Sequence, residues 1–117
     1  MALVKTSEEI EKIAIAGKIL KKTIDILREE TKEGVTLTAL DRLAKKIIEE
    51  NGGEPAFLNY LPEGASKPYP ATICASPNDV VVHGVPVARK IKSGDLISID
   101  CGVRYKGYYA DAAFTVG

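Results

Sequence analysis

The chain has 117 residues, 45% of them hydrophobic, which is enough for one compact domain with a buried core. Sixteen Lys and Arg residues balance sixteen Asp and Glu residues, so net charge favours neither nucleic acid nor an anionic membrane as a partner. No stretch approaches the roughly 20 apolar residues of a membrane-spanning helix. We therefore expect a soluble, cytoplasmic protein in which residues 1–117 form a single domain. Its two cysteines, Cys74 and Cys101, form no C-x-x-C pair and should be reduced.

The first predicted element is a long amphipathic helix over residues 7–30. Thr6 and Glu9 have the spacing of a capping box, and apolar residues then recur at helical intervals. Gly17 lies beside this apolar stripe, where we expect its missing side chain to permit close packing. The stripe consists of Ile10, Ile13, Ala16, Leu20, Ile24 and Leu27.

A second helix should follow. Thr38 and Asp41 are its candidate N-terminal caps, and it should end near Asn51, before Gly52 and Gly53. Its predicted buried stripe consists of Leu40, Leu43, Ala44, Ile47 and Ile48.

From residue 54 onward the sequence is typical of strands rather than helices. Pro and Gly recur, Val and Ile cluster, and the apolar period shortens towards two. We expect a loop over residues 61–70, short strands around 71–75 and 80–83, and a hairpin over 95–116. The predicted fold class is α+β, with two helices packed on a small, mostly antiparallel sheet.

The hairpin brings two carboxylates together. If the chain turns at residues 106–107, Gly102 faces Asp111 and Asp100 faces Ala113. The two aspartates are then diagonal neighbours on one face, with Cβ atoms at most about 7–8 Å apart. Two such carboxylates repel each other unless a proton or a cation neutralises them, and a divalent metal ion is one solution. The alternative is a pair of solvated aspartates on a wet face of the sheet.

His83 is the only histidine. It precedes Gly84-Val-Pro86 at the expected end of a strand, where loops carry function, and a neutral imidazole can hydrogen-bond a peptide substrate. A structural role for this histidine is the alternative.

Several segments occur here in a specific order: VVHGVP at residues 81–86, SID at 98–100 and GYYAD at 107–111, after an opening that runs from Lys5 to Lys18. Together they resemble the N-terminal half of the type I methionine aminopeptidases, over essentially all 117 residues. The resemblance implies one half of a pita-bread catalytic domain. It also implies the family's reaction, hydrolytic removal of the N-terminal Met from peptides and nascent proteins.

The same resemblance implies roles for individual residues. Asp100 would chelate one divalent metal ion and Asp111 would bridge two, the ions being Co, Mn, Fe, Zn or Mg. These ions would act as Lewis acids and activate the attacking water. His83 would be catalytic, contacting the substrate near the scissile amide and steadying the tetrahedral intermediate. The residues expected to line the methionine pocket are Phe57, Tyr60, Tyr69 and Cys74.

Complete relatives contain a second, pseudo-symmetric half that supplies one histidine and two glutamates to the metals. Three of the five ligand residues are therefore missing from residues 1–117, and ions held by two carboxylates alone bind weakly. We expect the chain by itself to be inactive or weakly active, and to associate with itself or with a complementary second half. One alternative is a non-catalytic or trace-active module that homodimerises around a four-carboxylate metal site. Another is a prolidase-like or creatinase-like substrate.

Overall fold

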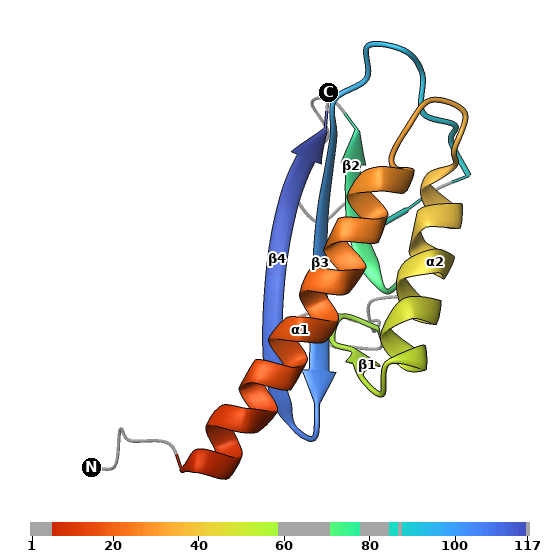
Figure 1. Cartoon of the computed structure of the whole chain (residues 1–117). Helices are drawn as coiled ribbons and strands as arrows, with labels where there is room; N and C mark the ends of the chain where they lie inside the picture. Colours follow the sequence, from red (N-terminus) through yellow and green to blue (C-terminus); the bar gives the residue numbers. More distant parts are fainter. Residues whose placement is uncertain (1–5, 59–70, 78–84, 87, 117) are drawn as a thin grey trace, which may run out of the picture.

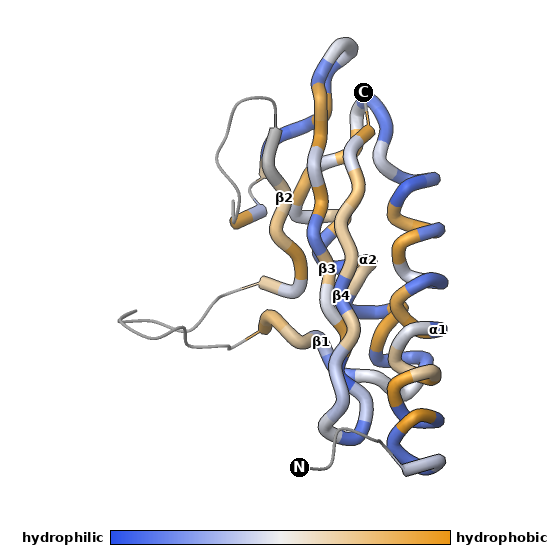
Figure 2. The backbone as a smooth tube through the Cα atoms, turned by 90° about the vertical axis from the view of Figure 1, so that its left-hand side faces the viewer, coloured by the Kyte–Doolittle hydropathy of each residue, from blue (hydrophilic) through white to orange (hydrophobic). Residues whose placement is uncertain are grey.

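The protein forms two layers, with helices on one face of an antiparallel sheet (Figures 1 and 2). The computed structural model describes residues 6–58, 71–77, 85–86 and 88–116. The elements are α1 (Ser7–Glu30), α2 (Leu37–Glu50), β1 (Glu54–Pro55), β2 (Ile73–Pro77), β3 (Ile97–Tyr105) and β4 (Tyr108–Val116). β3 is central, with β1 and β2 paired along one edge and β4 along the other, all antiparallel. The predicted α+β class is confirmed.

The predicted capping box at the start of α1 is confirmed. The Thr6 hydroxyl accepts from the Glu9 N–H at 3.2 Å, and the Glu9 carboxylate accepts from the Thr6 N–H at 3.2 Å. The apolar stripe becomes buried only from Ala16 onward, and Ile10 is 56% exposed. The prediction for Gly17 is wrong, because a Cβ at this position would meet no atom within 4 Å. Close packing does not require a glycine there.

The predicted caps of α2, Thr38 and Asp41, are wrong. The cap is Thr36, whose hydroxyl accepts from the Ala39 N–H at 3.1 Å. Thr36 also forms a β-bridge with Lys90, and this tertiary contact fixes where the helix begins. The buried residues of α2 are Leu37, Leu40, Ala44, Ile47 and Ile48, with Leu43 half-buried.

Asp41 has a different role, which is to hold β2. Its Oδ1 accepts from the N–H of Thr72 at 2.8 Å and from the N–H of Ile73 at 2.9 Å. β2 begins at Ile73, two residues later than predicted. The predicted loop over residues 61–70 and the predicted strand over 80–83 lie outside the described residues.

The hairpin of β3 and β4 has the predicted register. Lys106 has φ 48° and Gly107 has φ 87°, the two left-handed conformations that a type I′ turn requires. Gly102 therefore pairs with Asp111, and Asp100 pairs with Ala113.

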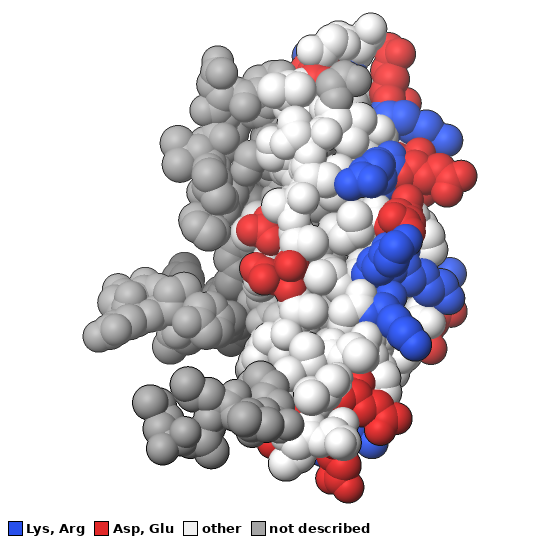
Figure 3. All heavy atoms as spheres, turned by 60° about the vertical axis from the view of Figure 1, so that its left-hand side comes forward, with Lys and Arg blue, Asp and Glu red and all other residues white. Residues whose placement is uncertain are grey.

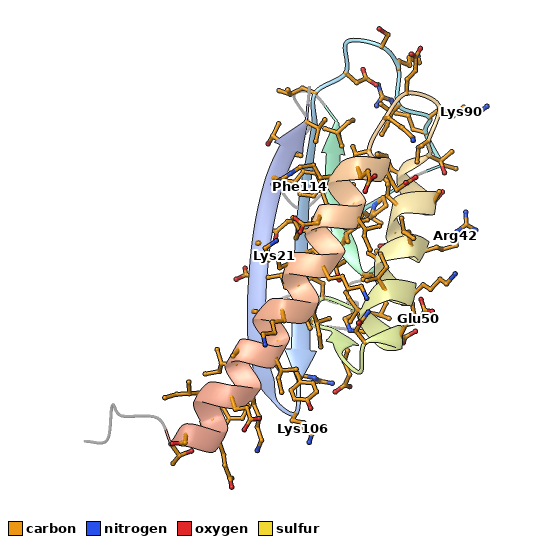
Figure 4. All side chains as sticks on the ribbon, in the orientation of Figure 1. Lys21, Arg42, Glu50, Lys90, Lys106 and Phe114 are labelled. Atoms are coloured by element: carbon orange, nitrogen blue, oxygen red, sulfur yellow. The ribbon has the colours of Figure 1, made fainter. Side chains whose placement is uncertain are left out.

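The core lies between the helices and the sheet. Alternate residues of β3 point into it, and Phe114 of β4 lies against α1, with the Arg28 guanidinium 5.2 Å from its ring centroid (Figure 4). Arg42 on α2 points away from the sheet (Figure 4). The core residues of β3 are Ile97, Ile99, Cys101 and Val103.

Within the described part of the chain, no helix is both long enough and apolar enough to cross a membrane. Neither Cys74 nor Cys101 is in a disulfide, and both are buried.

Candidate metal centre

The sheet face that points away from the helices carries the two predicted metal ligands. Side chains alternate between faces along a strand, and directly paired residues share a face. Asp100 is half-buried and Asp111 is exposed, and they are the only acidic residues of β3 and β4. Figure 3 shows this part of the surface as largely uncharged apart from one group of acidic side chains, with Lys and Arg gathered on the helical side.

The two aspartates are diagonal neighbours across Gly102. Asp111 is directly opposite Gly102, and Asp100 is the preceding residue of β3 on the same face. Their Cβ atoms are therefore at most about 7–8 Å apart, within the span of one bridged ion or ion pair. The strands place two hard oxygen donors of like charge side by side, which is the kind of ligand that divalent cations prefer.

An apolar hollow of about 290 Å³ lies beside Asp111. Phe57 forms one wall, and the sequence analysis did not name Ala56, Tyr109 or Ala110. The alternation of β4 identifies Tyr109, which shares the face of Asp111 two residues away. The lining consists of Ala56, Phe57, Tyr109, Ala110 and Asp111.

Cys74, the other described pocket candidate, lies next to Asp100. It pairs directly with Asp100 across β2 and β3, so both side chains are on the face away from the helices. Its side chain is buried, with 6% exposed. Cys74 is therefore close to the carboxylates but on the opposite side of β3 from β4. The remaining candidates, His83, Tyr60 and Tyr69, lie outside the described residues.

The basic residue on the strands that carry the two carboxylates forms an ion pair with an acidic residue of β1. Arg104 is the one basic residue of β3 and β4, and its guanidinium lies 2.7 Å from a carboxylate oxygen of Glu54. Hydrogen bonds with Glu54 and then Tyr109 raise the pKa of Arg104. The positive charge of Arg104 is therefore paired with Glu54 near the turn of the hairpin.

Cys101 does not belong to the site. Its side chain points into the core, and burial, followed by the charge of Asp100, raises the pKa of the thiol to about 12. The thiol is protonated at neutral pH and lies on the opposite face of β3 from the carboxylates.

Two carboxylates alone do not form a complete metal site. Among the residues that the structure describes, no group of three or more His, Cys, Asp or Glu side chains is arranged to hold an ion. Asp100 and Asp111 fit a hard divalent ion as two of its ligands.

The chain belongs to metallopeptidase family M24, whose sequence profile matches residues 11–117. It is 40% identical over all 117 residues to a methionine aminopeptidase of Clostridium perfringens, covering 45% of that protein. It is 46% identical over 112 residues to a methionine aminopeptidase of Aquifex aeolicus, a match that covers 95% of this chain and 43% of that protein. The chain thus spans less than half the length of these relatives.

Solved structures give the same result. A methionine aminopeptidase from Thermotoga maritima matches 99% of this chain and 45% of its own, with a TM-score of 0.86 and 37% identity. A prolidase from Pyrococcus furiosus matches 97% of this chain and 31% of its own, with a TM-score of 0.78 and 27% identity. The predicted resemblance to the N-terminal half of a methionine aminopeptidase is confirmed.

Proposed function

We propose that this chain provides one half of the active site of a metal-dependent methionine aminopeptidase. In this proposal Asp100 and Asp111 would hold the divalent ions as carboxylate ligands. The supporting observation is the placement of both carboxylates on one sheet face, beside a hollow walled by Phe57, in a chain of family M24. The proposed substrate is the N-terminus of a peptide or nascent protein that begins with Met. The proposed compartment is the cytoplasm, in keeping with two cysteines that form no disulfide.

The metal ions, the hollow and the individual residues would each have a separate role in the reaction. Bound ions, here Co, Mn, Fe, Zn or Mg, would supply Lewis acidity and lower the pKa of bound water. The hollow beside Asp111 would accept the apolar Met side chain against the Phe57 ring. The family resemblance assigns His83 to contact the substrate near the scissile amide, and it assigns Tyr60, Tyr69 and Cys74 to the pocket.

We propose that residues 1–117 alone bind metal weakly and have little or no activity. Two carboxylates leave most of an ion's coordination sphere to water, and weakly charged, open sites have low affinity. The missing ligands would come from a complementary second half.

The first experiment measures Mn²⁺ binding by electron paramagnetic resonance. The variants Asp100→Asn and Asp111→Asn should each lose most of the binding. Glu54→Gln is the matched control, because Glu54 is an acidic residue of the same sheet whose carboxylate pairs with Arg104. It should bind like the unaltered chain. Equal binding by all four proteins would contradict the proposed site.

The same samples are assayed for Met release from a Met-Gly peptide. We expect release near background for the unaltered chain. Efficient release that disappears in Asp100→Asn would show that this half builds a working site without a second one.

A second candidate is a self-associating module with little or no catalysis. The observation that favours it is the outer edge of β4, which has no strand partner among the described residues. Pairing of two copies there would bring four carboxylates to one continuous face.

A further inference from the structure

Gly102 lies between the two aspartates on the face that points away from the helices, and the Phe57 ring sits directly on it. A Cβ built on Gly102 would lie 2.9 Å from Cε1 of Phe57 and 3.1 Å from Cβ of Ala56. Real Cβ atoms essentially never come as close as the contact with Phe57, and the contact with Ala56 is tighter than most, so a side chain at this position requires a neighbour to move. The missing side chain therefore makes room for an aromatic ring.

The backbone under Phe57 is held in place, so the ring is the part that would move. Glu54 pairs with Arg104 and Pro55 pairs with Val103 on β3. The Ala56 N–H then donates to the Gly102 carbonyl at 3.1 Å. With three successive residues attached to β3, the segment has little freedom to retreat, whereas the Phe57 side chain can rotate.

We infer that Gly102 is a positioning residue that seats the Phe57 ring against the sheet and so shapes the apolar hollow beside Asp111. This inference rests on the proposed function for its biological meaning. In that setting Gly102 determines how an apolar substrate side chain fits next to the carboxylates, although it contacts neither substrate nor metal.

Gly53 provides a matched control on the other side of the sheet. A Cβ on Gly53 would lie 3.0 Å from Val103, 3.3 Å from Ile19 and 3.3 Å from Ile48, all of them side-chain atoms. Gly53→Ala therefore crowds the core to a similar degree but leaves the hollow untouched. Both variants should lower the melting temperature, and only Gly102→Ala should displace the Phe57 ring.

Fluorine NMR can follow the ring directly. The chain contains two phenylalanines, Phe57 and Phe114, so labelling with 4-fluorophenylalanine gives two resonances, which the variant Phe57→Ala assigns. Gly102→Ala should shift the Phe57 resonance by more than its linewidth and leave that of Phe114 in place. Gly53→Ala should leave the Phe57 resonance unmoved. An unmoved Phe57 resonance in folded Gly102→Ala would overturn the inference.

If Gly102→Ala does not fold, melting temperatures measured in a second background still test the inference. In the background of Phe57→Ala the clash with the ring is gone, so adding Gly102→Ala should lower the melting temperature much less than it does in the unaltered chain. An equal loss in both backgrounds, or a double variant that also fails to fold, would overturn the inference.

Mn²⁺ separates this inference from the proposed function. Bound Mn²⁺ should broaden the Phe57 resonance more than that of Phe114, and Asp111→Asn should abolish the difference. Absence of selective broadening in the unaltered chain would contradict the proposed metal site. The shift of the ring in Gly102→Ala is measured without metal and decides the role of Gly102 in either case.

Discussion

Glu9 shows how a single side chain joins the two ends of the protein. One carboxylate oxygen accepts from the Thr6 N–H and caps α1, and the other accepts from the Tyr108 hydroxyl at 3.1 Å on β4. The Lys12 ammonium lies 5.8 Å from the centroid of the same tyrosine ring. A residue recognised from the sequence only as part of a capping box therefore also fixes the helix to the hairpin.

Tyr108 should ionise at higher pH than an ordinary tyrosine. Burial, followed by the hydrogen bond to Glu9 and its charge, raises the pKa of Tyr108. The unfolded value is about 10. The neutral phenol is favoured in the folded state, so its contribution to stability is complete below about pH 10 and is lost as pH rises through the folded pKa.

The difference between absorbance titrations of the unaltered chain and Tyr108→Phe isolates this residue. Glu9→Gln should lower the pKa of Tyr108 without returning it fully to the ordinary value, because burial remains. A Tyr108 that titrates at or below pH 10 in the unaltered chain would contradict the assignment.

Gly17→Ala should stabilise the protein. The position is inside α1 and the added methyl group meets nothing within 4 Å, so the gain is the helix propensity difference of about 1 kcal/mol. Urea unfolding measures it. Gly34→Ala is the contrasting variant, since it has equal space but a φ of +91°, and it should lose roughly 1–2 kcal/mol. If the change in unfolding free energy has opposite signs at the two glycines, backbone conformation rather than available space determines the effect of the added methyl group.

Among the elements, β2 depends on α2 for its position. Asp41 accepts two N–H groups at the start of β2, and this strand then places Cys74 opposite Asp100. Removing the acceptor leaves two donors without a partner near the buried Thr72, so Asp41→Ala should cost about 1–3 kcal/mol.

Arg42→Ala is the control for this variant. Arg42 is the next residue of α2 and is exposed, pointing away from the sheet (Figure 4). Its removal should change the urea midpoint little. Faster amide exchange at Ile73 in Asp41→Ala, with α2 still protected, would locate the loss at the start of β2. Equal unfolding free energies for both variants would refute this role of Asp41.

The elements predicted well are those whose signals are local. The capping box defines the start of α1, and the turn at Lys106 and Gly107 sets the register that brings Asp100 and Asp111 together. Residues 36 and 38 are both threonines, so local chemistry cannot separate them as caps of α2. The β-bridge from Thr36 to Lys90 separates them, and it joins residues far apart in the sequence.

The features that the sequence did not predict also depend on contacts between residues far apart in the chain. Asp41 accepts hydrogen bonds from residues that lie 31 and 32 positions away in the sequence. The two-residue strand β1 is defined by its pairing with β3. The wall of the hollow similarly depends on the contact between Phe57 and Gly102, which the spacing of apolar residues in the sequence does not predict. The placement of Asp100 and Asp111 on one face could be predicted from the sequence, and the shape of the hollow beside them could not.

At the scale of the whole molecule, β4 is an edge strand with little protection. It carries one charged residue, Asp111, and no Pro, Lys or Arg, and among the described residues nothing pairs with its outer edge. We therefore expect the chain to dimerise as its concentration rises, with two β4 strands pairing antiparallel about a two-fold axis near Ala112.

Light scattering over a concentration series tests this expectation. Ala112 is exposed at the middle of β4, so Ala112→Lys places two like charges together at the axis and should give a monomer. Ala14→Lys adds the same charge to an exposed position of α1 and should associate like the unaltered chain. A monomeric mass at every concentration for the unaltered chain would exclude the dimer. Loss of the dimer in Asp100→Ala would show that metal takes part.

The bond from Glu9 to Tyr108 joins residues 99 positions apart, and it has a consequence for synthesis. While a ribosome makes this chain, α1 and α2 emerge long before β4, the strand that contacts the N-terminal part of α1. Contacts of such long range form slowly, since the intervening chain must first be closed into a loop. The apolar face of α1 is therefore left without its final cover until residue 116 has been made, and during that interval it is a natural target for a chaperone.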